Sequence, residues 1–215
     1  MKHSKYSTII FDCDGVIFDT NSLKISAFKK ALNAFPDDMV NPFIEYVKAN
    51  FGKTRMHFFQ HFLDNFAPQS PPSTYEKLLE SYGASCRSLY RKASLTQGFL
   101  DYAILHHSKS ELFVVSGNNG DELQEAFAYR KIDHFFSHIY GAPQSKKAGL
   151  TTILSSRERN SAVMIGDALM DYEAAKHHHI DFIFIAEYSM YKAQMLQLQK
   201  QVGFTTIQTL EELLV

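Results

Sequence analysis

The sequence predicts an α/β fold: a Rossmann-like parallel sheet with helices on both faces, and a small all-helical domain inserted after the first strand. Two observations support this prediction. Short, apolar, β-branched segments alternate with amphipathic ones along most of the chain, which is typical of parallel strands joined by helical crossovers. Residues 21–93 interrupt this alternation, because they contain helical patterns only.

The strands of the sheet are expected where the apolar segments are shortest and most β-branched. These segments are Thr8–Phe11, Leu112–Ser116, Ala162–Ile165, Phe182–Ala186 and Phe204–Ile207. The helices that connect the later strands are expected at Asp121–Tyr129, Ala148–Ser155, Asp171–His178 and Met190–Gln199. Thr209, followed by Leu210 and two glutamates, predicts the N-cap of a short terminal helix.

The inserted region is expected to contain four helices. They are predicted at Ser22–Phe35, Pro42–Ala49, Arg55–Phe66 and Thr74–Ala93. The breakers Pro36-Asp37-Asp38 and the loop Pro68–Ser73 separate them. We therefore divide the chain into a core domain, residues 1–20 and 94–215, and a helical domain, residues 21–93.

The composition excludes several classes of partner. Lys and Arg number 22 against 23 Asp and Glu, so the net charge of −1 gives no basic surface for nucleic acid or for an anionic membrane. No apolar run approaches the roughly 18 residues of a membrane-spanning helix, and the N-terminus lacks the pattern of a signal peptide. Two cysteines make no disulfide framework. We expect a cytoplasmic protein, and the sequence does not indicate its oligomeric state.

Carboxylates follow two of the predicted strands directly. In "FDCDGVIFDT", Asp12 and Asp14 come after the first strand, and alternation allows both to face the same way. "GDALMD" places Asp167 and Asp171 after the strand Ala162–Ile165. If these strands are neighbours, Asp12, Asp14 and Asp167 converge at one sheet edge and suit Mg²⁺, which prefers oxygen ligands. The alternatives are a solvated Asx turn at the first pair, and for Asp171 a favourable position near a helix N-terminus.

A second group of residues is suited to binding a phosphate. The strand Leu112–Ser116 leads into "SGNNG", where Ser116, Gly117 and Asn118 supply donors ahead of a helix N-terminus. "GAPQSKK" places Lys146 and Lys147 before another helix. One lysine could balance the acids and the phosphate, although most lysines are solvated surface charges. We favour Lys146, and Lys147 stays an alternative.

These four segments resemble, in order and spacing, the four motifs of the haloacid dehalogenase-like hydrolase superfamily, and the helical insertion resembles its mobile cap domain. The resemblance implies that Asp12 is a nucleophile forming an aspartyl-phosphate, and that Asp14 is the general acid and base. It further implies that Mg²⁺ is held by Asp12, the Asp14 carbonyl and Asp167, with Asp171 close by. Ser116, Gly117, Asn118 and Lys146 would surround the phosphoryl group.

Within the superfamily, Asp14 argues for phosphate monoesters, because dehalogenases lack an acid two residues after the nucleophile. The implied function is a Mg²⁺-dependent phosphatase acting on a small phosphorylated metabolite, such as a sugar phosphate. Lys53 and Arg55 in "NFGKTR" resemble the Gly-x-x-Arg cap loop of the β-phosphoglucomutase branch, where the arginine would grip a sugar or second phosphate. A phosphomutase is therefore the alternative, and a non-catalytic phospho-acceptor or binding module is a third reading.

Overall fold

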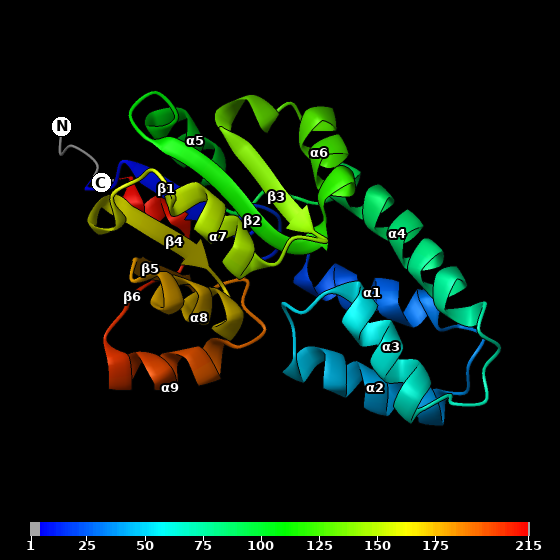
Figure 1. Cartoon of the computed structure of the whole chain (residues 1–215). Helices are drawn as coiled ribbons and strands as arrows, with labels where there is room; N and C mark the ends of the chain where they lie inside the picture. Colours follow the sequence, from blue (N-terminus) through cyan, green and yellow to red (C-terminus); the bar gives the residue numbers. More distant parts are fainter. Residues whose placement is uncertain (1–4, 215) are drawn as a thin grey trace.

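The computed structural model describes residues 5–214, and within them it contains one parallel sheet of six strands in the order β3-β2-β1-β4-β5-β6 (Figure 1). The strands are β1 (Thr8–Phe11), β2 (Glu111–Asn119), β3 (His138–Ala142), β4 (Ala162–Gly166), β5 (Asp181–Ile185) and β6 (Thr205–Ile207). All pairings are parallel, as the alternating pattern predicts. The predicted α/β fold class is confirmed.

The helices fall into two groups along the chain. Those of the inserted segment are α1 (Asn21–Ala31), α2 (Asp37–Ala49), α3 (Arg55–Asn65) and α4 (Thr74–Lys92). Those of the core are α5 (Phe99–His106), α6 (Gly120–Tyr129), α7 (Lys146–Leu154), α8 (Leu169–His178) and α9 (Lys192–Val202).

Alternation along the strands divides the core into two apolar layers. Ile9 and Phe11 of β1 face the layer that contains residues of α5 and α6, whereas Ile10 faces the layer that contains residues of α7, α8 and α9. Both faces of the sheet are therefore covered, which is why its strands are apolar at nearly every position.

The inserted helices α1 to α3 form a group beside the carboxyl ends of the strands, and the long helix α4 leads back to the core (Figure 1). We call α1 to α4 the cap. Its interior is aromatic: the Phe28 ring lies 5.4 Å from Phe58 and from Phe59, and Phe43 lies 5.0 Å from Phe62. The phenylalanines at helical spacing in α3 are thus packing residues of the cap.

Several local features differ from the sequence prediction. The strand β3 was not predicted, because it lies at the sheet edge and only Ile139 and Ala142 in it are buried. Nor was α5, which has eight residues and exposes Leu100, Ile104 and Leu105, so its pattern is not amphipathic.

One predicted helix start was wrong, and the terminal helix is of a different kind. The second cap helix begins at Asp37 rather than Pro42, because Pro36 takes the N-cap position and the two aspartates occupy the first turn. The terminal helix begins after Thr209 as predicted, with Glu211 and Glu212 in its first turn, but it is a 3₁₀ helix over Leu210–Leu213 and the Thr209 side chain makes no capping hydrogen bond.

The sequence led us to expect no membrane-spanning helix and no disulfide framework. Within residues 5–214, no helix is both long and apolar enough to cross a membrane. Cys13 and Cys86 are both free and buried.

Candidate active site

The carboxyl ends of β1, β2 and β4 meet at one edge of the sheet. Phe11, the last residue of β1, is paired with Val114 of β2 and with Ile165 of β4. The residues that follow these strands therefore come together. Ligand oxygens of Asp12, Asp167 and Asp171 all lie within 4.8 Å of one another, so Asp171 stands in this group where the sequence led us to expect Asp14.

The three carboxylates of this cluster are almost inaccessible to solvent. Asp12 is 5%, Asp167 4% and Asp171 0% exposed. Burial, followed by the charges of Asp171 and Asp14, raises the pKa of Asp12 to about 7, although Lys146 opposes the shift. Burial and the Asp12 and Asp171 charges also raise the pKa of Asp167. Buried carboxylates held this close need a cation or a proton between them, so the donor set fits a hard divalent ion.

Lys146 supplies one cation to this cluster. It begins α7, where the Ser145 side chain accepts from the Ala148 N–H, and it is 8% exposed. Its Nζ lies 2.9 Å from Asp12 Oδ1 and 2.5 Å from Asp171 Oδ1. Lys147 is exposed, so the structure places Lys146 and not its neighbour among the acids.

Asp171 is fixed by contacts from its own turn. Besides Lys146, its carboxylate accepts from the backbone N–H groups of Asp167 and Ala168 at 3.3 and 3.1 Å. Gly166 leaves the space for this carboxylate, because a Cβ there would lie 2.3 Å from Asp171 Cβ. Asp171 therefore orients Lys146 and the loop of Asp167.

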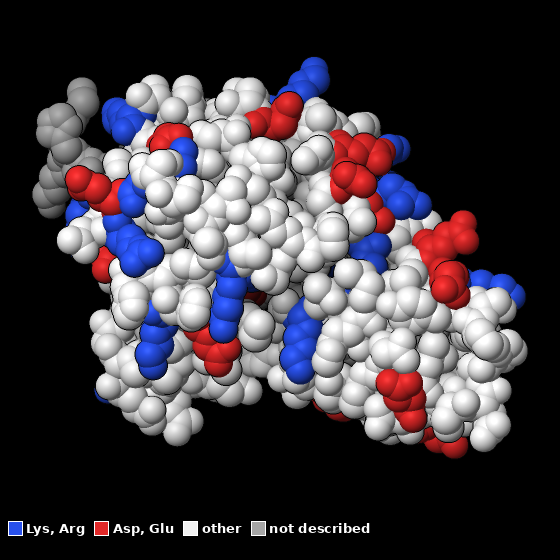
Figure 2. Space-filling view, viewed as in Figure 1, with Lys and Arg blue, Asp and Glu red and all other residues white. Residues whose placement is uncertain are grey.

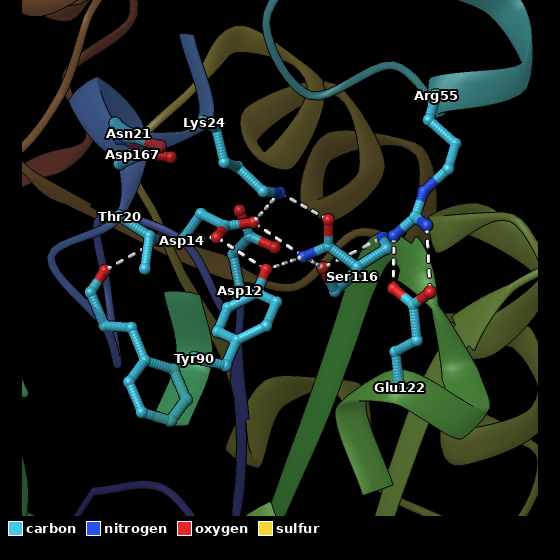
Figure 3. Close-up of polar contacts among 12 residues, drawn as sticks. Asp12, Asp14, Thr20, Asn21, Lys24, Arg55, Tyr90, Ser116, Glu122 and Asp167 are labelled. Carbon is cyan, nitrogen blue, oxygen red and sulfur yellow. Dashed lines mark hydrogen bonds and ion pairs between the residues drawn. The ribbon is translucent and has the colours of Figure 1, made fainter. Parts of the chain in front are cut away.

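The Asp14 carboxylate is not part of the three-carboxylate cluster, and donors surround it (Figure 3). Its Oδ1 accepts from Thr20 Oγ1 at 2.5 Å and Tyr90 Oη at 2.8 Å, and its Oδ2 accepts from Lys24 Nζ at 2.5 Å and Asn118 Nδ2 at 2.6 Å. Burial alone would raise the pKa of Asp14, but the Lys24 charge and these hydrogen bonds outweigh it and lower the pKa. Asp14 is therefore held as a carboxylate.

The predicted phosphate-binding residues lie at the end of β2. Ser116 is 2% and Asn118 8% exposed, and the Asn118 amide donates to Ser116 Oγ at 2.9 Å. A Cβ at Gly117 would lie 3.0 Å from the carbonyl oxygen of Gly52 in the cap. Gly117 thus allows the cap loop to approach the end of β2.

The predicted cap residues line the same pocket as the acids. Lys53 and Arg55 border it together with Asp12, Ser116 and Lys146. Figure 2 shows the hollow between the core and the cap, with Lys and Arg side chains beside it. Arg55, however, forms a bidentate ion pair with Glu122 of α6, with N···O distances of 3.0 and 2.5 Å.

Sequence reasoning missed four residues that contact the acids. Thr20 is the N-cap residue before α1, Asn21 and Lys24 lie at the beginning of α1, and Tyr90 lies on α4. The Asn21 amide donates to Asp167 Oδ2 at 2.6 Å and to the Tyr188 carbonyl at 2.9 Å, which ties the cap to the metal-ligand candidate. The sequence did contain an indication that Lys24 is buried, because it lies four residues before Phe28 and therefore on the same buried face of α1.

Comparison with known proteins identifies the family. The family model described as haloacid dehalogenase-like hydrolase matches residues 9–185. The pyrophosphatase PpaX of Listeria welshimeri is 25% identical over 189 residues, which cover 80% of this chain and 79% of that protein.

Solved structures share the fold. A predicted phosphoglycolate phosphatase from Haemophilus somnus superposes with a TM-score of 0.77 at 15% identity, covering 98% of this chain and 97% of its own. The HAD-hydrolase YfnB of Bacillus subtilis, described as bound to magnesium, gives 0.69 at 15% identity, covering 97% and 96%. With the family model spanning most of the sheet and all four motif segments, the chain belongs to the haloacid dehalogenase-like hydrolases.

Proposed function

We propose that this hydrolase is a Mg²⁺-dependent phosphatase of small phosphorylated metabolites that works through an aspartyl-phosphate on Asp12. The observation that carries the proposal is the convergence of Asp12, Asp167 and Asp171 within 4.8 Å, next to a buried lysine. The relative from Listeria is described as a pyrophosphatase and the neighbour from Haemophilus as a predicted phosphoglycolate phosphatase, which supports a small phosphorylated substrate.

The metal ligands would be Asp12, Asp167 and the Asp14 backbone carbonyl, with Asp171 close by. The raised pKa of Asp12 and of Asp167 supports this assignment, because a divalent ion offsets the burial and the carboxylate repulsion that raise both pKa values. When bound, the ion would neutralise charge on the phosphoryl oxygens and so favour attack by Asp12 on phosphorus. The description of the YfnB structure as bound to magnesium supports the choice of ion.

In the first step, an oxygen of Asp12 attacks phosphorus and the bond from phosphorus to the leaving oxygen breaks. Lys146 and the donors of Ser116 and Asn118 would stabilise the phosphoryl oxygens. Asp14 would give a proton to the leaving oxygen. Because its pKa is lowered in the free protein, it must take up that proton as the anionic substrate arrives, since nearby negative charge raises a carboxyl pKa.

In the second step, water attacks the aspartyl-phosphate, phosphate leaves and Asp12 is restored. The resting state of Asp14 suits this step, because an ionised carboxylate can accept the proton of the attacking water. Thr20, Tyr90 and Lys24 hold the Asp14 carboxylate in place throughout.

The substrate would be enclosed between the core and residues 21–93, which we propose act as the cap. The pocket combines polar groups with Phe28, Phe51, Phe58 and Tyr82. Closure by these rings excludes water from the first step, which favours transfer to Asp12.

The test compares two aspartates of the same motif. Asp12→Asn should reduce Mg²⁺-dependent turnover of an aryl phosphate by at least about 1000-fold, with the circular dichroism spectrum unchanged. Asp19→Asn is the control, because Asp19 is exposed, and its turnover should stay within about twofold of wild type. Undiminished turnover by Asp12→Asn would show that the nucleophile is misassigned.

A screen of phosphate release over sugar phosphates, nucleotides, phosphoglycolate and pyrophosphate, with and without Mg²⁺, would identify the substrate. An isomerised sugar phosphate without release of phosphate would favour the phosphomutase alternative.

A further inference from the structure

The cap and the core are joined by a buried ion pair outside the acid cluster. Arg55 begins α3 of the cap, and Glu122 lies in the first turn of α6 of the core. Both guanidinium Nη atoms are used, one on each carboxylate oxygen, at 3.0 and 2.5 Å (Figure 3). Their side chains are only 9% and 11% exposed.

The surroundings of this pair are shaped to hold it. The Glu122 N–H donates to the Asn119 side chain at 3.0 Å, and Glu122 Oε1 also accepts from Arg87 of α4 at 3.1 Å. The Arg55 guanidinium lies over the Tyr82 ring, 5.0 Å from its centroid.

A glycine inside α4 leaves room for the pair. A Cβ at Gly83 would lie 2.8 Å from Glu122 Oε1 and 3.0 Å from Arg55 Nη1. Glycine weakens a helix interior, and here it stands in the middle of a helix of 19 residues. The absence of a side chain at this position is therefore what lets α3, α4 and α6 meet around the two charges.

We propose that Arg55 and Glu122 form a clamp that holds the cap closed over Asp12, so that Arg55 is a positioning residue and not a group that grips the substrate. A substrate anion could pair with Arg55 only if the Arg55–Glu122 ion pair broke. The buried Glu122 carboxylate would then keep only the exposed Arg87 as its cation, and this loss of a partner is unfavourable. The clamp also places the loop before α3, where Gly52 approaches Gly117 and Lys53 borders the pocket.

The test is a charge-swap cycle with an exposed pair as control. The variants are Arg55→Ala, Glu122→Ala, their double variant and the exchanged pair Arg55→Glu/Glu122→Arg. Arg91 and Glu125 are the control, because they join α4 to α6 at 2.5 Å but are about half exposed. Kinetics are measured on an aryl phosphate, which has no second anion, and on phosphoglycolate, which has one.

The clamp predicts that both single variants raise KM by about tenfold on both substrates, with a smaller effect on kcat. The KM of the double variant should be no higher than that of either single variant. The exchanged pair should recover at least about half of the kcat/KM that the single variants lose. The KM values of Arg91→Ala and Glu125→Ala should stay within about twofold of the wild-type KM. If Arg55→Ala raises KM only for phosphoglycolate while Glu122→Ala lowers it, Arg55 grips the substrate and the clamp is refuted.

The kinetic part rests on the proposed phosphatase activity, so a second readout is independent of it. Limited proteolysis without substrate should cut the loops at residues 50–54 and 93–98 faster in Arg55→Ala and Glu122→Ala than in the Arg91 and Glu125 variants. Equal cutting rates in all variants would overturn the clamp. Absence of turnover in the wild type would overturn the proposed function alone.

Discussion

Replacing Gly15 by alanine tests whether the first motif and Asp167 meet as the structure shows. Gly15 has a φ of +72°, and a Cβ there would lie 2.4 Å from Asp167 Oδ2 and 2.5 Å from Asn21 Nδ2. No Cβ tolerates such contacts, so the carboxylate or the amide must move. Since these two groups are hydrogen bonded to each other at 2.6 Å, the methyl group would separate a metal-ligand candidate from its support.

The expected destabilisation by Gly15→Ala has two parts, the backbone strain at a positive φ and the steric clash with Asp167 and Asn21. A matched variant at Gly203 measures the first part alone. Gly203 has a φ of +81°, and a Cβ at this position would have no atom within 4 Å, so Gly203→Ala carries the backbone cost alone. That cost is about 1–2 kcal/mol. Gly15→Ala adds the loss of a hydrogen bond to a buried charged group, about 1.5–3 kcal/mol, for a total of roughly 2.5–5 kcal/mol.

The assay is thermal unfolding with and without Mg²⁺, together with turnover of an aryl phosphate. At about 2–4 °C per kcal/mol for a chain of this size, Gly203→Ala should lower Tm by about 2–8 °C and keep its activity. Gly15→Ala should lower Tm further, lose at least about 100-fold in turnover and lose the stabilisation by Mg²⁺. If both variants show the same Tm shift and the same activity, Gly15 does not adjoin Asp167.

Two further predictions concern charge at the site. Lys24→Met should destabilise the protein by about 3–5 kcal/mol, because it leaves Asp14 buried without its ion-pair partner, and the double variant Lys24→Met/Asp14→Asn should regain stability in urea unfolding. A double variant no more stable than Lys24→Met would show that the two charges do not compensate each other. For pH, the pKa of Asp12 is raised to about 7 in the metal-free fold, so the stability from protonating it is present at low pH and is lost as pH rises through 7. Tm without metal should therefore fall between about pH 4.5 and 7.5, and the increase in Tm caused by Mg²⁺ should grow over the same range. A metal-free Tm that is level or rises over this range would contradict this sign.

The sequence predicted the parts of the site that lie next to strand ends. Asp12 and Asp167 each follow an apolar strand directly, so alternation and the rule for parallel sheets place them at one edge. The neighbours of Asp14 could not be predicted in this way. Lys24 and Tyr90 come from helices at opposite ends of the cap, and only the packing of α1 against α4 brings them together.

Arg55 shows a different limit of local reasoning. Its spacing from Gly52 favours a substrate-binding arginine, yet its partner is Glu122, 67 residues later. In the sequence Glu122 is simply an acid in the first turn of a helix, which the helix dipole explains fully. A motif within one segment can indicate which charge is available, but the opposing element determines what that charge binds.

The contacts at the start of α1 connect the cap directly to the carboxylates of Asp14 and Asp167. Thr20 and Lys24 hold Asp14, and Asn21 holds Asp167, so the N-cap and first turn of α1 donate to acids that follow two different strands. A proton on Asp14 would weaken the Lys24 ion pair, and a cation on Asp167 would compete with the Asn21 amide for the same carboxylate. Because Thr20, Asn21 and Lys24 are neighbours at the start of α1, each of these changes of charge would act on the same element. The position of α1 and the charge of the acids would therefore be linked through three side chains within five residues of the chain.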